Sequence, residues 1–334
     1  MTLSKEQIAR YSRQLILPEV GVKGQERLLR AAVLIVGAGG LGSPAAFYLA
    51  AAGVGTIGII DRESVAHSNL HRQIVHATGE VGRPKSLSAQ ARLHALNPEV
   101  VVVPVQEALT AANARHVAAP YDLVLDGSDN FPTRYLVNDA CILLNKPLVH
   151  GGVVHVEGQV MTILPRRSAC LRCVFPEPPQ PGAIPSCQEA GVLGSAAGVI
   201  GTIMAHEALK VLLVLGEPLV NRLLVFDGRM SRFREVAVRR DPACAACGDA
   251  TTIQERTVIE ETACHMRPKL TERSERKFVA ECDPTPSGTP IGQAGIERRV
   301  LNQMVEHGTM PTLGVGFNSH SNLCSLSFHK LRAH

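Results

Sequence analysis

A glycine-rich segment is the first part of this sequence whose residue types and spacing indicate chemistry. Gly37, Gly39 and Gly42 fit the spacing G-x-G-x-x-G directly after an apolar run and directly before an Ala-rich stretch. Glycine permits a tight turn and a close backbone approach to a ligand, and the N-terminus of the following helix presents free N–H groups to phosphate. Asp61 follows the next apolar run, where a carboxylate can accept hydrogen bonds from ribose hydroxyls. The pattern predicts a nucleotide site with NAD as its default ligand; the alternative is a tight turn that binds nothing.

Polar and cationic side chains that follow Asp61 favour a nucleoside triphosphate over NAD. They are Ser68, Asn69, Arg72, Gln73 and Lys85. A triphosphate carries more charge than a dinucleotide, and it therefore favours Arg and Lys side chains together with a metal ion. Asp129, in a loop after a further apolar run, is a candidate ligand for Mg²⁺, which proteins usually hold with one or two carboxylates plus phosphates. Taken singly, each cation is better explained as a solvated surface charge. Expected together at one sheet edge, they favour a nucleoside triphosphate.

Two pairs of cysteines have the spacing of a zinc site. Cys170 and Cys173 form one C-x-x-C pair, and Cys244 and Cys247 form the other. Four thiolates make a closed tetrahedral zinc site, and the long separation of the pairs predicts a structural site that joins two distant parts of one domain. The alternatives are buried thiols or redox pairs. A thioredoxin-like pair would begin a helix after a strand, which the sequence indicates for neither pair.

Cys187 stands alone between a proline-rich loop (176–185) and a long apolar helix. A thiol near a helix N-terminus in an exposed loop can have a lowered pKa and act as a nucleophile, although a lone cysteine is more often inert. Cys141 lies within an apolar helix and is expected in the core.

These residues are expected at the ends of buried strands. Continuous rather than alternating apolar runs argue for a parallel sheet that helices cover on both faces. The expected strands are 32–36, 56–60, 100–105, 123–125, 148–154, 159–164, 223–226 and 233–238, and the expected helices are 4–15, 42–52, 86–96, 132–144 and 193–215. The fold class is therefore α/β: a Rossmann-like, mostly parallel sheet with helices on both faces, an antiparallel extension and a structural zinc knuckle.

Composition excludes several classes of protein. The chain has 334 residues and a net charge of +4, which is too small for nucleic-acid binding through bulk charge. With no Trp, four Tyr and eight Phe, the core must be built from small and aliphatic residues, which suits a parallel sheet. Residues 1–10 are polar, so no secretory signal is expected, and nine cysteines without a signal indicate the cytoplasm. The long apolar helix contains Glu207 and Lys210, which favours a buried helix over a membrane span.

The ordered set of motifs resembles the E1-like adenylating enzymes of the ThiF/MoeB/HesA type, which activate ubiquitin-like sulfur-carrier proteins. The resemblance covers about residues 3–248 and is carried by 10–15 (RYSRQL), the glycine segment, Asp61, 68–73, Lys85, Asp129 with Asn130, Thr133 and Arg134, both cysteine pairs and 185–194. The proline loop with SCQEAGVLG looks more like the molybdopterin-synthase branch than the thiamine-thiazole branch. Molybdopterin, thiamine and tRNA-thiolation routes all stay open.

The resemblance implies a role for each matching nucleotide residue. Gly40 and its neighbours in the glycine segment, with Asp61, would hold the ribose and the α-phosphate of ATP. The other phosphates and the magnesium ion would be bound by Asn69, Arg72, Lys85 and Asp129, with Asn130 nearby. Zinc would bind to the four paired cysteines. The product would be a carrier whose C-terminal Gly-Gly carboxylate is adenylated, ready for conversion to a thiocarboxylate.

The resemblance also implies partners. Arg13 would reach into the site of a second subunit, which makes the enzyme a homodimer with shared sites, and Cys187 would match the thioester position of the family. Arg13, Arg72, Lys85 and Cys187 would then be the catalytic residues. Residues 1–248 are expected to form the adenylation domain, and 249–334 a largely disordered tail.

The tail is not expected to be a rhodanese domain, because neither Cys264 nor Cys282 begins a loop of the C-x-x-G-x-R kind. The sulfur donor is therefore expected to be a separate protein, such as a sulfurtransferase or cysteine desulfurase. Two other classes of protein stay open. The glycine segment and Asp61 also fit an NAD-dependent oxidoreductase, and a non-catalytic scaffold of the same fold is disfavoured by the intact Arg72, Lys85 and Asp129.

Overall fold

The apolar runs of the sequence form the strands of one mixed sheet. The computed structural model describes residues 3–179, 190–251 and 253, which all fall within one unit spanning Met1–His265. Over these residues the sheet has eight strands in the order β3-β2-β1-β4-β5-β6-β7-β8. The strands are β1 (Ala32–Val36), β2 (Thr56–Ile60), β3 (Val101–Val105), β4 (Leu123–Asp126), β5 (Leu148–Val154), β6 (Glu157–Ile163), β7 (Arg222–Asp227) and β8 (Arg232–Ala237). Pairing is parallel from β3 to β5 and antiparallel from β5 to β8, as the sequence predicted.

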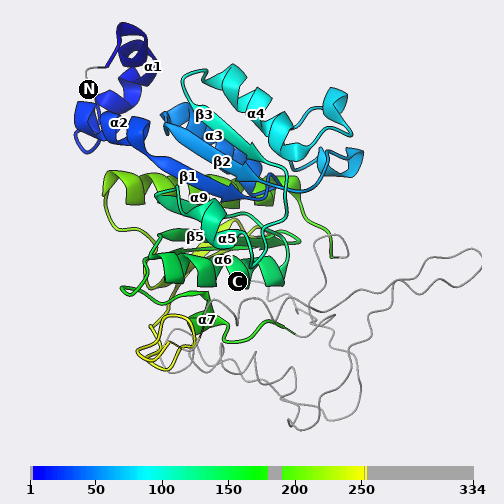
Figure 1. Ribbon diagram of the computed structural model, residues 1–334, viewed down its shortest axis with the longest axis vertical. Coiled ribbons are helices and arrows are strands. Elements are labelled where there is room, and N and C mark those ends of the chain that lie inside the picture. The colour runs from blue at the N-terminus through cyan, green and yellow to red at the C-terminus, as the bar shows by residue number, and fades with distance from the viewer. Residues whose placement is uncertain (1–2, 180–189, 252, 254–334) are drawn as a thin grey trace, which may run out of the picture. The chain divides into compact units, whose positions relative to one another are not determined.

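Helices cover both faces of the parallel half of the sheet (Figure 1). The helices are α1 (Lys5–Leu15), α2 (Gly21–Arg30), α3 (Gly42–Ala52), α4 (Lys85–Leu96), α5 (Ala114–Ala118), α6 (Phe131–Leu144), α7 (Leu171–Val174) and α9 (Gly194–Leu213), with 3-10 turns η1 (His67–Asn69) and η2 (Thr78–Glu80). Helices α3 and α9 contribute to the core on one face, and α6 contributes to the core on the other.

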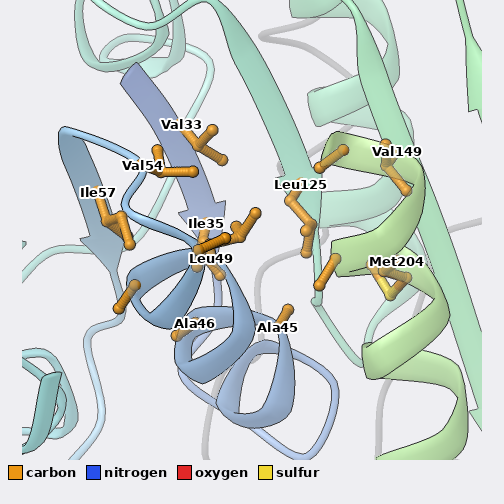
Figure 2. Close-up of a cluster of buried hydrophobic side chains, with 14 of the residues drawn as sticks. Val33, Ile35, Ala45, Ala46, Leu49, Val54, Ile57, Leu125, Val149 and Met204 are labelled. Carbon is orange, nitrogen blue, oxygen red and sulfur yellow. The ribbon is translucent and has the colours of Figure 1, made fainter. Parts of the chain in front are cut away.

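Successive side chains of β1 point to opposite faces of the sheet, and both faces are buried, which explains why its sequence is continuously apolar. Val33 and Ile35 belong to the core cluster that includes α3 and α9, and Figure 2 shows Ile35 beside Leu49 of α3. Leu34 and Val36 belong to the cluster on the opposite face, which includes residues of α6. All four side chains are at most 4 % exposed. A strand buried on both faces needs an apolar residue at every position.

Helix α9 lies close to the start of α3, and a glycine makes this approach possible. A Cβ atom at Gly201 would lie only 2.3 Å from the carbonyl oxygen of Leu41, directly before α3. In the part of the chain that the structure describes, α9 is the one helix long and apolar enough to cross a membrane. Its Ile200 and Met204 side chains are fully buried, and Figure 2 places Met204 beside Leu125 and Val149 of the sheet. This arrangement agrees with the predicted buried helix.

Helices α2, α5 and the four-residue α7 escaped the sequence prediction. Helix α2 begins at Gly21, whose φ is +54°, and contains Gly24, so its intrinsic helix propensity is low. Leu28 is nonetheless 1 % exposed, because α2 packs against neighbouring elements. Helix α5, of five residues, is too short to give a periodic signal. Packing also continues to Ile253, whose N–H donates to the carbonyl of Ala245 (3.3 Å). The predicted domain limit at residue 248 stays a prediction, and the tail beyond residue 253 lies outside the described residues.

Candidate functional site

The predicted glycine segment forms a tight loop between β1 and α3. Gly37 has φ +91°, a conformation that favours glycine, and its N–H donates to the carbonyl of Ile60 (2.9 Å). A Cβ atom at Gly42 would lie 1.9 Å from the carbonyl oxygen of Gly37, so no larger residue fits without moving the loop. The loop also lies against the end of β4, since a Cβ atom at Gly37 would be 3.1 Å from the oxygen of Gly127.

The loop presents backbone donors that the protein itself does not use. Among the described residues, the N–H groups of Gly39, Gly40 and Leu41 have no protein acceptor. Gln73 approaches the loop, because a Cβ atom at Gly39 would lie 3.9 Å from its Nε2. The side chain of Gln73 is 4 % exposed, and its Oε1 has no partner in the described part of the chain. Free N–H groups at the start of a helix are suited to phosphate.

Asp61 holds the glycine loop as well as facing it. Its Oδ2 accepts from the N–H of Ala38 (2.9 Å), and its Oδ1 accepts from the N–H of Glu63 (2.8 Å). Burial raises the pKa of Asp61, while these two hydrogen bonds and the charge of Lys85 act in the opposite direction. Asp61 therefore follows β2 at the end where the glycine loop follows β1, as the βαβ pattern predicted.

Arg72 covers the glycine loop from the side of α9. Its Nη1 donates to the carbonyl of Ser68 (2.9 Å), and a Cβ atom at Gly40 would lie 3.4 Å from its Cγ. A Cβ atom at Gly194, the first residue of α9, would lie 2.2 Å from the carbonyl oxygen of His71. The Oδ1 of Asn69 accepts from the N–H of Ala66 (3.1 Å). The start of α9 therefore fixes the segment that bears the predicted phosphate ligands.

Lys85 begins α4 and is buried, with a side chain only 3 % exposed. Its Nζ donates to Oε2 of Glu63 (2.6 Å), whose side chain is 56 % exposed. The hydrogen bond from Lys85 lowers the pKa of Glu63. Sequence analysis did not single out Glu63, although its position two residues after Asp61 is visible in the sequence.

Asp129 and Asn130 lie in the loop after β4. Asp129 is exposed. Asn130 is the N-cap of α6, and its Oδ1 accepts from the N–H of Thr133 (3.0 Å). Because Gly127 contacts the glycine loop, the loop after β4 comes to the same edge of the sheet as the loop after β1. The predicted magnesium ligand, Asp129, is therefore exposed and stands two residues after Gly127, which contacts the nucleotide loop.

Beside this loop lies a buried Asp–His hydrogen bond that sequence analysis missed. Asp126 accepts from Nδ1 of His150 (2.8 Å) and from Oγ of Ser128 (2.6 Å). Burial alone would raise the pKa of Asp126, but these hydrogen bonds and the charge of Arg134 hold it below its ordinary value. Two apolar strands supply the pair, so no local pattern distinguishes either residue from its strand.

Arg13 lies apart from the residues named so far. It is exposed in the last turn of α1. Helix α1 contacts the C-terminal ends of α3 and α4, since Gln14 Nε2 donates to the carbonyl of Ala52 (2.9 Å) and Arg10 Nη1 to that of Leu96 (3.0 Å). Helix α3 starts at the glycine loop and, with 11 residues, is roughly 16 Å long. Within one chain, Arg13 is therefore at the opposite end of α3 from the glycine loop.

The two cysteine pairs come together in one cluster. The Sγ atoms of Cys170, Cys173, Cys244 and Cys247 all lie within 4.8 Å of one another. The Sγ atoms of Cys170 and Cys244 are 3.6 Å apart, and those of Cys173 and Cys247 are 3.4 Å apart. Cys170 is the N-cap of α7, so the expectation that neither pair begins a helix is wrong for the first pair. The redox alternative is nonetheless disfavoured, because the two pairs face each other.

Hydrogen bonding within the cluster favours thiolates at some positions. The hydrogen bond from Cys170 lowers the pKa of Cys173 to about 7, and the N–H of Asp241 also donates to Sγ of Cys173 (3.4 Å). Cys141 is buried in α6, as predicted, and burial raises the pKa of its thiol. Cys187 lies outside the described residues.

Three comparisons with known proteins agree with one another. A model described as the ThiF family matches residues 11–246. The "sulfur carrier protein adenylyltransferase" of Thermus thermophilus is 53 % identical over 272 residues, which is 80 % of this chain and 100 % of that protein. The "adenylyltransferase and sulfurtransferase MOCS3" of Anopheles gambiae is 47 % identical over 79 % of this chain, but the match spans only 60 % of that longer protein. A crystal structure of E. coli MccB with ATP shares the fold, with a TM-score of 0.64 and 23 % identity over 72 % of this chain and 75 % of that one.

Proposed function

This chain belongs to the ThiF family, and from that premise we propose that it is an adenylyltransferase that activates the C-terminal Gly-Gly carboxylate of a ubiquitin-like sulfur-carrier protein. The observation that carries the proposal is the loop of unused N–H groups, with Asp61, Arg72 and Lys85 brought to it from three further segments. The matched relatives named adenylyltransferases support this reading over an NAD-dependent oxidoreductase.

ATP would bind with its phosphates at the glycine loop. The ribose hydroxyls would donate to Asp61, whose carboxylate oxygens retain acceptor capacity beside their two backbone donors. Arg72 and Lys85 would supply positive charge to the phosphates, with Ser68, Asn69 and Gln73 as polar neighbours. A magnesium ion at Asp129 would neutralise phosphate charge. Because the Asp129 carboxylate and the phosphates are both negatively charged, they would repel each other without a cation between them.

The reaction needs no general base, because the carrier's carboxylate is already anionic. One of its oxygens forms a bond to the α-phosphorus of ATP, the bond to the bridging oxygen breaks, and pyrophosphate leaves with that electron pair. The protein would contribute in-line positioning and charge neutralisation by Arg72 and Lys85. Whether Cys187 then takes the acyl group as a thioester is a separate prediction of the family resemblance. The separate sulfur donor is a further one.

The cysteine cluster fits zinc. A tetrahedral ion with Zn–S bonds near 2.3 Å places its sulfurs ~3.8 Å apart, and two sulfur pairs in the cluster are already 3.6 and 3.4 Å apart. Four cysteines leave no open position, so zinc would join the segment after β6 to the segment after β8 without touching substrate. The five described cysteines form no disulfide, which suits the cytoplasm that we propose for this protein.

We also propose a homodimer, with Arg13 completing the site of a second subunit. The support is that α1 lies at the far end of α3 from the glycine loop of its own chain, while Arg13 is exposed. An adenylation domain over residues 1–248 completes the proposal.

The test is ATP–pyrophosphate exchange with purified ubiquitin-like proteins that end in Gly-Gly. Radiolabelled pyrophosphate should enter ATP only when the carrier is present, and a carrier that lacks its last two glycines serves as the matched control. Exchange that ignores the carrier's C-terminus would contradict the proposed substrate. Absence of exchange with every carrier, together with tight NAD binding, would favour the oxidoreductase.

A further inference from the structure

The glycine loop can present its free N–H groups to a ligand only if the buried peptide groups next to them are held in place by hydrogen bonds. The unused N–H groups of Gly39 and Gly40 follow Ala38, which is 2 % exposed. The N–H of Ala38 donates to Asp61, so the N–H side of this residue is held by a carboxylate already assigned to the nucleotide. The carbonyl of Ala38 is equally buried and needs a donor of its own, because an unsatisfied buried carbonyl is costly.

His76 supplies that donor. Its Nε2 lies 3.0 Å from the carbonyl oxygen of Ala38, and its Nδ1 lies 2.8 Å from Oγ of Ser88. The His76 side chain is 7 % exposed and Ser88 is fully buried. Ser88 Oγ in turn lies 2.7 Å from Oε2 of Glu80, which also accepts from the N–H of Ala77 (3.2 Å).

The carbonyl of Ala38 determines which ring nitrogen of His76 carries a proton. A carbonyl oxygen only accepts, so Nε2 must carry a proton. Burial lowers the pKa of His76 and favours the neutral ring, and the charge of Lys85 lowers the pKa further. The hydrogen bond to Ala38 and the charges of Asp61 and Glu80 act in the opposite direction. In the neutral ring Nδ1 is an acceptor, and so is Oε2 of Glu80, so the single hydroxyl hydrogen of Ser88 is shared between these two acceptors as alternatives.

We propose that His76 is a positioning residue for ATP: its Nε2–H holds the Ala38 carbonyl and thereby keeps the glycine loop in the conformation that binds phosphate. The inference rests on the proposed function. It also links two parts of the nucleotide site, because Ser88 stands three residues after Lys85 on α4. The chain Ala38–His76–Ser88 therefore sets the loop against the helix that bears the buried lysine.

The experiment measures the Kd of Mg·ATP by isothermal titration calorimetry for the full chain, so no carrier is needed. His76→Phe keeps a ring but removes the donor, and it should weaken ATP binding about tenfold, as expected for the loss of one buried hydrogen bond. His76→Gln places an amide N–H near the position of Nε2 and should stay within about threefold of wild type. His76→Asn reaches only toward Ser88 and should resemble the Phe variant.

Thr162→Val is the matched control. It removes another buried hydrogen bond, from Thr162 Oγ1 to Glu207 (2.7 Å), on β6 and α9 rather than at the loop, and it should leave the Kd unchanged. A thermal melt without nucleotide verifies folding. If His76→Phe does not fold, the comparison of Gln with Asn decides. Equal affinities for Gln and Asn, or a folded Phe variant within twofold of wild type, would overturn the inference. Wild-type protein that does not bind ATP would instead refute the proposed function.

Discussion

Lys85 is buried, whereas its ion-pair partner Glu63 is exposed to solvent. Its side chain is 3 % exposed, whereas that of its partner Glu63 is 56 % exposed. Lys85→Met keeps the length of the side chain, and water can solvate the carboxylate that it leaves behind. We therefore expect the fold to survive and the Kd of Mg·ATP to rise roughly 10- to 100-fold, the range for a hydrogen bond to a charged group. Calorimetry measures this, with Lys146→Met as the control that removes a charge elsewhere; equal effects of the two variants would refute the role of Lys85.

His76 should also make stability depend on pH. Because burial lowers its pKa in the folded protein, the unfolded chain binds a proton at a higher pH than the folded one does. The contribution of His76 is therefore fully present above the unfolded pKa of about 6.5 and is lost as pH falls below it. Asp61, Glu80 and Lys85 face the ring and are unchanged in a His76→Gln variant.

Denaturant unfolding of both proteins between about pH 5 and 7.5 isolates this effect. The free energy of unfolding should fall more steeply toward acid in wild type than in His76→Gln. The other histidines are common to both proteins and cancel in the difference. Parallel curves would show that His76 does not stay neutral on folding.

At the scale of elements, two of the three glycines of helix α9 have opposite surroundings. A Cβ atom at Gly194 would lie 2.2 Å from the carbonyl oxygen of His71, whereas nothing lies within 4 Å of one at Gly198. Gly194→Ala must therefore displace the segment that bears Arg72, and we expect weaker ATP binding and a lower Tm. Gly198→Ala should raise the free energy of unfolding by ~0.5–1 kcal/mol, because alanine favours the helix, and should leave the Kd for ATP unchanged. Calorimetry and thermal melts of both variants check this; weaker ATP binding in Gly198→Ala would contradict it.

The same elements explain what sequence could and could not predict. The strands were predictable because β1 and β2 are buried on both faces, and the glycine loop because its spacing is local. Helix α2 was not, since packing of Leu28 rather than propensity stabilises it. The hydrogen bonds of His76 join residues 38 and 88, and those of His150 reach Asp126. Only the packing of neighbouring elements brings such residues together, so no spacing in the sequence indicates them.

At the scale of the whole molecule, the cysteine cluster joins two segments that are distant in the chain. Purified protein should contain about one zinc ion per chain, and Cys170→Ser should lower that content. Removal of the ion by a chelator should lower the Tm by about 10 °C, because a structural metal contributes directly to folding. Elemental analysis and thermal melts measure both effects, with Cys141→Ser, whose thiol lies outside the cluster, as the control for zinc content. Full zinc loading of Cys170→Ser would exclude the site.

The proposed dimer makes a prediction that no single chain can satisfy. If Arg13 acts in the site of the second subunit, then Arg13→Ala and Lys85→Met should each abolish pyrophosphate exchange alone. In a mixed dimer, the Lys85→Met subunit donates its intact Arg13 to the site that keeps Lys85. Equal amounts of both variants, unfolded and refolded together, should therefore recover about a quarter of the wild-type sites, since half of the random dimers are mixed and each has one complete site. Exchange assays with the same carrier measure this, and each variant refolded alone is the control. A mixture that stays inactive would exclude the action of Arg13 in the site of the second subunit, whereas full exchange by Arg13→Ala alone would show that Arg13 has no role in the reaction.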